Sequence, residues 1–262
     1  MNRWRAIGAG VLAGAVIGVA AVALAGYGDP ATPPPKRPEL PPAPRPALVI
    51  PPPEGLGRET GLTRWAPLRR PTPARAAPSS AARVLARLST RTPERTAHPL
   101  PVVGRRADGS GRLWLRVRLP ILPNGTLGWV PRRAVGGYEL VRHRLVVDLG
   151  EYEATLLLGD REVFSAPVGI GQARWPTPRG EFIVRNRLER YQSPQYGPVA
   201  FGTSARSATL TDWPAGGFVG IHGTDRPDIL PGEVSHGCIR LRNADILRLA
   251  ELMPVGTPVV IR

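Results

Sequence analysis

The stretch IHGTDRPDILPGEVSHGCIRL, residues 221–241, holds the only cysteine of the 262-residue chain and two of its four histidines. Its last four residues alternate in polarity, so the side chains of Cys238 and Arg240 should face one side of a strand. Ile239 and Leu241 should face the other side, which suits a hydrophobic core. We therefore expect the thiol and the guanidinium to share the open face of a β-sheet.

Gly237 stands directly before the cysteine, where glycine permits the tight backbone geometry that exposes a nucleophile. Backbone N–H groups in such a turn could stabilise the negative oxygen formed when a thiolate attacks a carbonyl. Upstream, His222 ends the segment GGFVGIHG on the face opposite its apolar neighbours, and Gly223 turns the chain away. A cysteine needs a neighbouring base to act as a nucleophile at neutral pH. His222 and His236 could each serve, and the residue pattern does not choose between them.

Residues 139–262 are predicted to form a mainly β domain, a sandwich or barrel with one or two helices. Short apolar segments separated by glycine, proline and aspartate turns predict its strands: HRLVVDL, EATLLLG, REVFSAPVGIG, EFIVRNRL, GGFVGIHG and TPVVI. One helix is expected over residues 244–253, capped by Asn243 and stopped by Pro254. His143 precedes a strand, and the sequence suggests no function for it.

Residues 59–138 are predicted to form a small β module. ARVLARLSTRTP and GRLWLRVRLP alternate as half-buried strands do, and Asn124-Gly125 is a strong signal for a two-residue hairpin turn. Asn124-Gly125-Thr126 also fits a glycosylation acceptor, but we prefer the turn. By its pattern and its closing GWV, the module resembles a bacterial SH3-like barrel. His98 lies in a polar, proline-flanked loop and is expected to be exposed.

The chain is predicted to be exported. Residues 1–26 start with two arginines and continue with 20 residues without a charge, from 6 to 25. This segment fits an uncleaved membrane anchor or a signal peptide cleaved after Ala23-Leu24-Ala25. Residues 27–58 follow as a proline-rich linker, in which proline excludes helix and strand and favours a stiff extended spacer. We expect the rest to lie outside the cytoplasm, at the cell wall or periplasmic side, either membrane-anchored or secreted.

The positive charge is concentrated in the first half of the chain. Residues 1–140 contain 21 Lys and Arg against 7 Asp and Glu, and residues 141–262 contain 14 against 13. A basic half could attract anionic wall polymers or a membrane surface, although it could also be only a solvated arginine-rich surface. Export argues against nucleic acid. A single cysteine also excludes a multi-cysteine zinc site, and in an exported chain it suggests a reactive thiol or an intermolecular disulfide.

The motifs together carry a specific resemblance. IHGT followed by SHGCIRL, with 12 residues between His222 and Ser235, resembles the signature of the L,D-transpeptidase (YkuD-like) catalytic domain. VGIGQARWPTPRGEFIV is similar to that family's Thr-Pro-x-Gly-x-Phe region, and the likeness covers about 120 residues. The gap of 12 residues is on the short side for the family.

The resemblance implies roles for these residues. Cys238 would be the nucleophile, His222 the acid/base, and the carbonyl of Gly223 the acceptor that orients the imidazole. Ser235 and His236 would shape the pocket with Gly237, and Arg240 could bind a stem carboxylate or form a structural ion pair. The thiolate would attack the amide before the terminal D-alanine of a peptidoglycan tetrapeptide stem, and a second stem would accept the acyl group in a 3→3 cross-link. No metal or cofactor is implied, and we expect a monomer acting on peptidoglycan stem peptides.

Other functions fit the same residues. Water as the acceptor would make the protein an L,D-carboxypeptidase, and a protein amine would make it a protein-to-wall attachment enzyme. The intact Cys238 and His222 argue against a wall-binding protein without catalysis. A buried inert cysteine would leave the histidine and glycine flanks of Cys238 unexplained.

Overall fold

Seven antiparallel strands in the first half of the described chain form one sheet. The structure, a computed structural model, describes residues 62–189, 193–210 and 217–262. The strand order is β3-β2-β6-β5-β4-β1-β7. The bounds are β1 (Thr63–Pro67), β2 (Thr72–Arg75), β3 (Val84–Leu88), β4 (Pro99–Ala107), β5 (Leu113–Arg118), β6 (Leu127–Pro131) and β7 (Glu139–Val141). Its apolar side chains, among them Leu100, Leu115 and Val130, form a core of their own. The likeness of this sheet to an SH3-like barrel stays a prediction.

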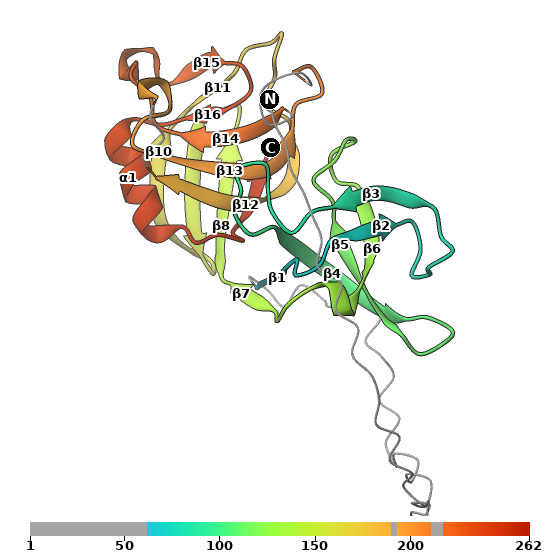
Figure 1. The fold of residues 1–262 in the computed structure, drawn as a ribbon. Coiled ribbons are helices and arrows are strands. Elements are labelled where there is room, and N and C mark those ends of the chain that lie inside the picture. The colour runs from blue at the N-terminus through green and yellow to red at the C-terminus, as the bar shows by residue number, and fades with distance from the viewer. Residues whose placement is uncertain (1–61, 190–192, 211–216) are drawn as a thin grey trace, which may run out of the picture. The chain divides into compact units, whose positions relative to one another are not determined.

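A second sheet of ten strands follows, in the order β10-β9-β8-β17-β12-β13-β14-β16-β11-β15 (Figure 1). The bounds are β8 (His143–Asp148), β9 (Glu153–Leu158), β10 (Arg161–Pro167), β11 (Gly169–Gly171), β12 (Gly180–Glu189), β13 (Val199–Arg206), β14 (Phe218–His222), β15 (Gly232–Ser235), β16 (Ile239–Arg240) and β17 (Pro258–Ile261). This mainly β fold with one α-helix in the described residues confirms the predicted class. The predicted strands of this half are all present, with REVFSAPVGIG divided into β10 and β11.

The helix α1 (Asn243–Leu252) packs against β10 and β13 and buries Ile246, Leu249 and Ala250. Its predicted cap is wrong. The helix starts at Asn243 itself, after Arg242, and no side chain caps its first turn. The Asn243 amide oxygen instead accepts the backbone N–H of Thr224 at 3.0 Å, so it fastens the loop after β14. Three short 3₁₀ turns complete the elements: η1 (Arg132–Ala134), η2 (Pro194–Tyr196) and η3 (Pro227–Ile229).

Two further predictions in the first half are wrong. His98 is 8% exposed rather than solvent-facing, because its Nδ1 lies 2.8 Å from the carbonyl oxygen of Ser89 and holds the ring inside. The strands β5 and β6 are joined by residues 119–126, so Asn124-Gly125 is not a two-residue hairpin loop. The two residues do form a turn within this longer connection, where the Thr126 N–H donates to the Pro123 carbonyl at 3.3 Å. The Asn124 side chain also bonds the backbone of Arg206 in the second sheet.

The predicted N-terminal segment (residues 1–26) and proline-rich linker (27–58) lie outside the described residues. Within the part that is described, no helix is long and apolar enough to cross a membrane. Both sheets belong to one compact unit of the chain.

Candidate active site

The strands β14 and β16 bring the two ends of the quoted motif together. They run parallel as neighbours in the second sheet, with Ile221 opposite Ile239 and His222 opposite Arg240. The alternation predicted for CIRL is confirmed, because Ile239 and Leu241 are fully buried. Cys238 and Arg240 face a cavity on the other side.

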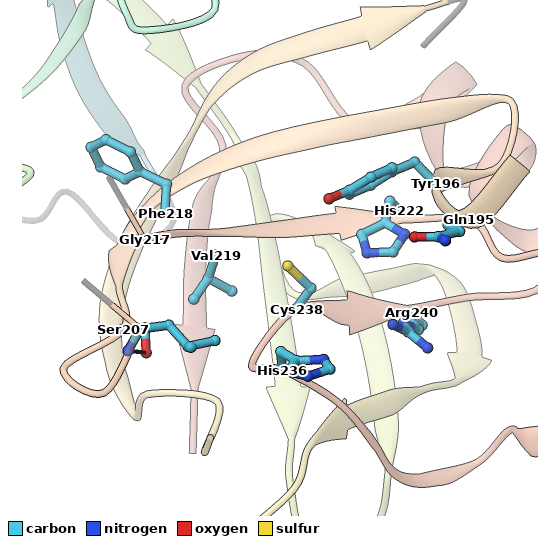
Figure 2. Close-up of a pocket in the computed structure, with 11 residues that line it drawn as sticks. Gln195, Tyr196, Ser207, Gly217, Phe218, Val219, His222, His236, Cys238 and Arg240 are labelled. Carbon is cyan, nitrogen blue, oxygen red and sulfur yellow. Dashed lines mark hydrogen bonds between the residues drawn. The ribbon is translucent and has the colours of Figure 1, made fainter. Parts of the chain in front are cut away.

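The sulfur of Cys238 lies beside β14. The backbone N–H of Gly220 donates to Sγ at 3.3 Å. A Cβ placed on Gly220 would lie 3.8 Å from both Cys238 Sγ and His222 Cδ2. The thiol and the imidazole therefore border the same point, as Figure 2 shows.

The cavity around them has a volume of about 140 Å³. Its walls combine aromatic, apolar and polar groups on β14, on β16, on the segments before these two strands and on the 3₁₀ turn η2. The lining residues are Gln195, Tyr196, Ser207, Leu210, Gly217, Phe218, Val219, His222, His236, Cys238 and Arg240. Such a concave site with a few convergent polar groups is typical of small-molecule and peptide binding.

His222 is held in one orientation. It is 3% exposed, and its Nδ1 lies 2.6 Å from the carbonyl oxygen of Gly223. Because a carbonyl only accepts hydrogen bonds, Nδ1 carries the proton and Nε2 is left as the basic nitrogen. The Tyr196 ring, 4.7 Å away between centroids, covers the imidazole.

Burial lowers the His222 pKa to about 4, with the Gly223 carbonyl opposing that change and the charge of Arg240 adding to it. Burial also raises the pKa of the Cys238 thiol, and the Gly220 N–H and Arg240 oppose it. At neutral pH the resting pair is thus a thiol beside a neutral imidazole. This arrangement suits proton transfer from sulfur to Nε2 as the sulfur attacks.

The turn before the cysteine is fixed by hydroxyl groups. Ser235 Oγ donates to the Cys238 carbonyl at 2.6 Å and accepts the Gly237 N–H at 3.0 Å. Ser235 is 1% exposed and lies behind the cavity, so it holds the turn. Gly237 has a φ of +108°, which agrees with the tight geometry expected there. Its N–H is bonded to Ser235, however, so it is not one of the donors expected for an oxyanion.

Thr177 is a further residue of this turn that the sequence did not single out. Its Oγ1 donates to the Gly237 carbonyl at 2.9 Å and accepts the N–H of Gly171 at 2.8 Å. The hydroxyl therefore ties the end of β11 to the turn before Cys238. Its only signal in the sequence was its place in the WPTPRG motif.

The structure separates the two candidate histidines. His236 is exposed and lines the cavity, and its ring lies 3.9 Å from that of Trp175. Partial burial, Arg174 and Arg240 lower its pKa. Only His222 combines deep burial with a ring nitrogen bonded to the Gly223 carbonyl, which favours it as the base.

Arg240 lines the cavity beside the histidines. Its Nη1 donates weakly to the carbonyl of Val234 at 3.4 Å, and its buried Nε has no hydrogen-bond partner. Over the described ranges no acidic side chain forms an ion pair with it, so the alternative of a structural ion pair finds no support. In the same residues, no three His, Cys, Asp or Glu side chains gather as a metal site would require.

Comparisons with known proteins agree on one family. The model of the L,D-transpeptidase (YkuD) catalytic domain matches residues 142–261. The L,D-transpeptidase homologue YkuD of Bacillus licheniformis is 37% identical over 123 residues, which cover 47% of this chain and 67% of the relative. The homologue YqjB of Bacillus subtilis is 32% identical over 125 residues, covering 45% and 69%. The catalytic domain of the Enterococcus faecium L,D-transpeptidase, solved by NMR, is 24% identical with a TM-score of 0.35, covering 46% and 96%.

The chain spans about two thirds of the length of these two Bacillus relatives. The matched part starts at the second sheet and contains every residue of the HG…SHGC motifs. On the family match and the identity to these relatives, the chain belongs to the L,D-transpeptidase (YkuD) family.

Proposed function

We propose that this protein is a peptidoglycan L,D-transpeptidase that forms 3→3 cross-links through a thioacyl-enzyme on Cys238. The observation that carries the proposal is the pairing of the Cys238 thiol with His222. The ring of His222 is fixed by the Gly223 carbonyl in the tautomer that leaves Nε2 free to accept a proton. In this proposal Cys238 is the nucleophile, His222 the acid/base and Gly223 the orienting acceptor.

The proposed reaction has two steps. His222 Nε2 takes the thiol proton as Cys238 Sγ bonds to the carbonyl carbon before the terminal D-alanine. The C–N bond then breaks, and the leaving amine takes that proton from His222. In the second step the amine of another stem attacks the thioester, His222 accepts its proton, and the proton returns to the sulfur as the C–S bond breaks.

The lowered pKa of His222 and the raised pKa of Cys238 favour a reaction that starts from the neutral thiol and the neutral imidazole over one that starts from a thiolate–imidazolium ion pair. The imidazolium then exists only during the reaction, when a negative oxygen or thiolate lies beside it. A base that is neutral at working pH is what general-base catalysis needs.

Arg240 is proposed to bind a carboxylate of the stem peptide. Its Nε is buried without a partner and its guanidinium lines the cavity, and a planar guanidinium binds a carboxylate through two parallel hydrogen bonds. Arg240→Lys keeps the charge but loses the paired donors, so we expect the KM for a tetrapeptide stem to rise about tenfold. An unchanged KM would remove Arg240 from the binding site.

One experiment separates the candidate functions. The protein is incubated with a disaccharide-tetrapeptide, and the products are identified by mass spectrometry. A cross-linked dimer supports transpeptidation, whereas a tripeptide alone points to the L,D-carboxypeptidase. Transfer only to an added protein amine indicates wall attachment, and unchanged substrate a non-catalytic wall-binding protein.

A second test addresses the nucleophile and the base. Cys238→Ala should form no covalent adduct with a carbapenem, because the thiol is the group acylated. An adduct on that variant would show that another residue is the nucleophile. His222→Ala should lose more activity than His236→Ala, and the reverse order would make His236 the base.

The rest of the chain is proposed to place this site at the cell wall. We propose export through residues 1–26, a spacer in 27–58 and an SH3-like module in 59–138. The excess of arginine in the first half supports contact with anionic wall polymers or a membrane surface.

A further inference from the structure

Glu94 and Asn124, which lie in two loops of the first half, bond residues of the second sheet near one wall of the catalytic cavity. The first is Glu94, in the loop between β3 and β4. Its carboxylate accepts two hydrogen bonds from the guanidinium of Arg185 in β12, at 2.9 and 3.1 Å. It also accepts the side-chain amide of Asn186 at 2.9 Å. Arg185 is 2% exposed, so Glu94 is the carboxylate that compensates a deeply buried cation.

The Arg185 guanidinium connects this contact to the cavity. Its Nε donates to the carbonyl of Thr203 at 2.6 Å. Its Cζ lies 3.8 Å from the centroid of the Phe218 ring. Phe218 is the first residue of β14, the strand that ends at His222, and it is one of the residues that line the cavity. Its ring points away from Cys238 (Figure 2), so its backbone helps to form the wall while its ring anchors the start of the strand. The position of Phe218 therefore depends on a cation that Glu94 holds.

The second contact is made by Asn124. Its amide nitrogen donates to the Arg206 carbonyl at 2.8 Å, and its amide oxygen accepts the Arg206 N–H at 3.0 Å. This pair of bonds imitates a neighbouring strand at the end of β13. The next residue, Ser207, lines the cavity, and its N–H donates to the carbonyl of Gly217 at 2.8 Å. Arg206 Cζ also lies 4.8 Å from the Phe218 ring.

We infer that Glu94 and Asn124 are positioning residues of the active site, which set the cavity wall formed by Ser207 and Phe218 and so help to select the donor peptide. The inference rests on the proposed function. The first half of the described chain would then contribute to substrate recognition, in addition to the residues of the catalytic motif.

A third contact between the same two sheets supplies a matched control. Arg118 of β5 pairs with Glu181 of β12 at 2.9 Å, with side chains 23% and 40% exposed. Glu181 lies near the start of β12, four residues before Arg185, and does not line the cavity. Removing this ion pair should weaken the contact between the sheets without moving Phe218.

The test uses the full chain with the variants Glu94→Gln, Asn124→Ala and Glu181→Gln. D-alanine release from a disaccharide-tetrapeptide gives KM and kcat. The rate of Cys238 alkylation by iodoacetamide reports the nucleophile alone, because the chain has no other thiol. We expect Glu94→Gln and Asn124→Ala to raise KM about tenfold, with kcat and the iodoacetamide rate within about twofold of wild type. Glu181→Gln should leave all three unchanged, and Glu94→Asp should recover part of the loss.

If Glu94→Gln and Asn124→Ala behave like Glu181→Gln, the inference is wrong. It is also wrong if the two variants lower the iodoacetamide rate by the same factor as kcat/KM for D-alanine release. The substitutions would then disturb Cys238 itself and not only the binding of the donor peptide. Should Glu94→Gln fail to fold in thermal unfolding, Asn124→Ala alone decides between these outcomes, because its side chain lies in a part-buried surface turn.

A second measurement does not depend on the proposed reaction. If the wild type releases no D-alanine and forms no cross-link, the proposed function fails. The ratio of Cys238 alkylation rates with a bulky maleimide and with iodoacetamide still reports the cavity wall. We expect this ratio to rise about threefold in Glu94→Gln and Asn124→Ala and to stay constant in Glu181→Gln. A constant ratio in all three variants would overturn the inference.

Discussion

Replacing His222 by asparagine should make the protein less sensitive to acid. The His222 pKa is 6.5 in the unfolded chain and about 4 in the folded one, mainly because the ring is buried. The folded chain therefore binds the proton less readily than the unfolded chain, and acidification favours unfolding. The free energy of unfolding is therefore not reduced by His222 above pH 6.5, and it decreases as the pH falls from 6.5 towards 4.

The magnitude follows from the two pKa values. The difference corresponds to about 3 kcal/mol once the pH has reached the folded pKa. At pH 5, about 2 kcal/mol of the free energy of unfolding should be lost through His222 alone. The carboxylates with lowered pKa values, such as Glu94 and Asp148, titrate mostly below pH 5 and contribute little in this range.

Urea unfolding at pH 8 and pH 5 measures the effect. We expect the wild type to lose about 2 kcal/mol more between these pH values than His222→Asn does. Asparagine is neutral, and its amide can still donate to the Gly223 carbonyl. His236→Asn should change the pH dependence much less than His222→Asn does, because the His236 ring is exposed. If His222→Asn loses as much stability as the wild type, the ring is not buried in its neutral form and the assignment of Nε2 as the resting base fails.

Three other substitutions have defined outcomes. Gly220→Ala places a methyl group in ordinary van der Waals contact with Cys238 Sγ and the His222 ring. We expect the free energy of unfolding to change by less than about 0.5 kcal/mol and the rate of carbapenem acylation to fall about tenfold. An unchanged acylation rate would contradict the close approach of the thiol and the imidazole. Ser235→Ala removes the hydroxyl that bonds Gly237 and the Cys238 carbonyl, and should cost about 1–3 kcal/mol in urea unfolding and slow acylation. Gly171→Ala would bring a Cβ to 2.2 Å from a backbone oxygen and should destabilise the fold by about 3 kcal/mol, measured by thermal unfolding against the open-surface control Gly109→Ala.

Local patterns in the sequence predicted the strands and the direction of the candidate catalytic side chains well. Alternation along CIRL placed Cys238 and Arg240 on one face because strand side chains point to opposite sides at each step. The helix near the C-terminus followed from its apolar spacing and from Pro254. These signals lie within about ten residues and depend on nothing farther along the chain.

Contacts between distant residues could not be predicted in this way. Asn243 has the chemistry of an N-cap, but Thr224 offers it a backbone N–H from 19 residues upstream. Asn124 lies in a turn, as its chemistry predicts, but its amide also bonds Arg206, 82 residues away. His98 looked exposed because its neighbours are polar, whereas the carbonyl of Ser89 holds the ring inside. In each case a polar side chain met a partner that only the folded chain supplies.

The parallel pairing of β14 with β16 has a consequence for how this site can vary. Hydrogen bonds between neighbouring strands keep them about 4.8 Å apart whatever the length of chain that connects them. Residues 225–228, in the connection from His222 to Cys238, are all exposed. Extra residues inserted there would lengthen a surface loop and leave the distance between the imidazole and the sulfur unchanged. A peptide tag or a recognition loop could therefore be added at this point without changing how Cys238 and His222 are placed.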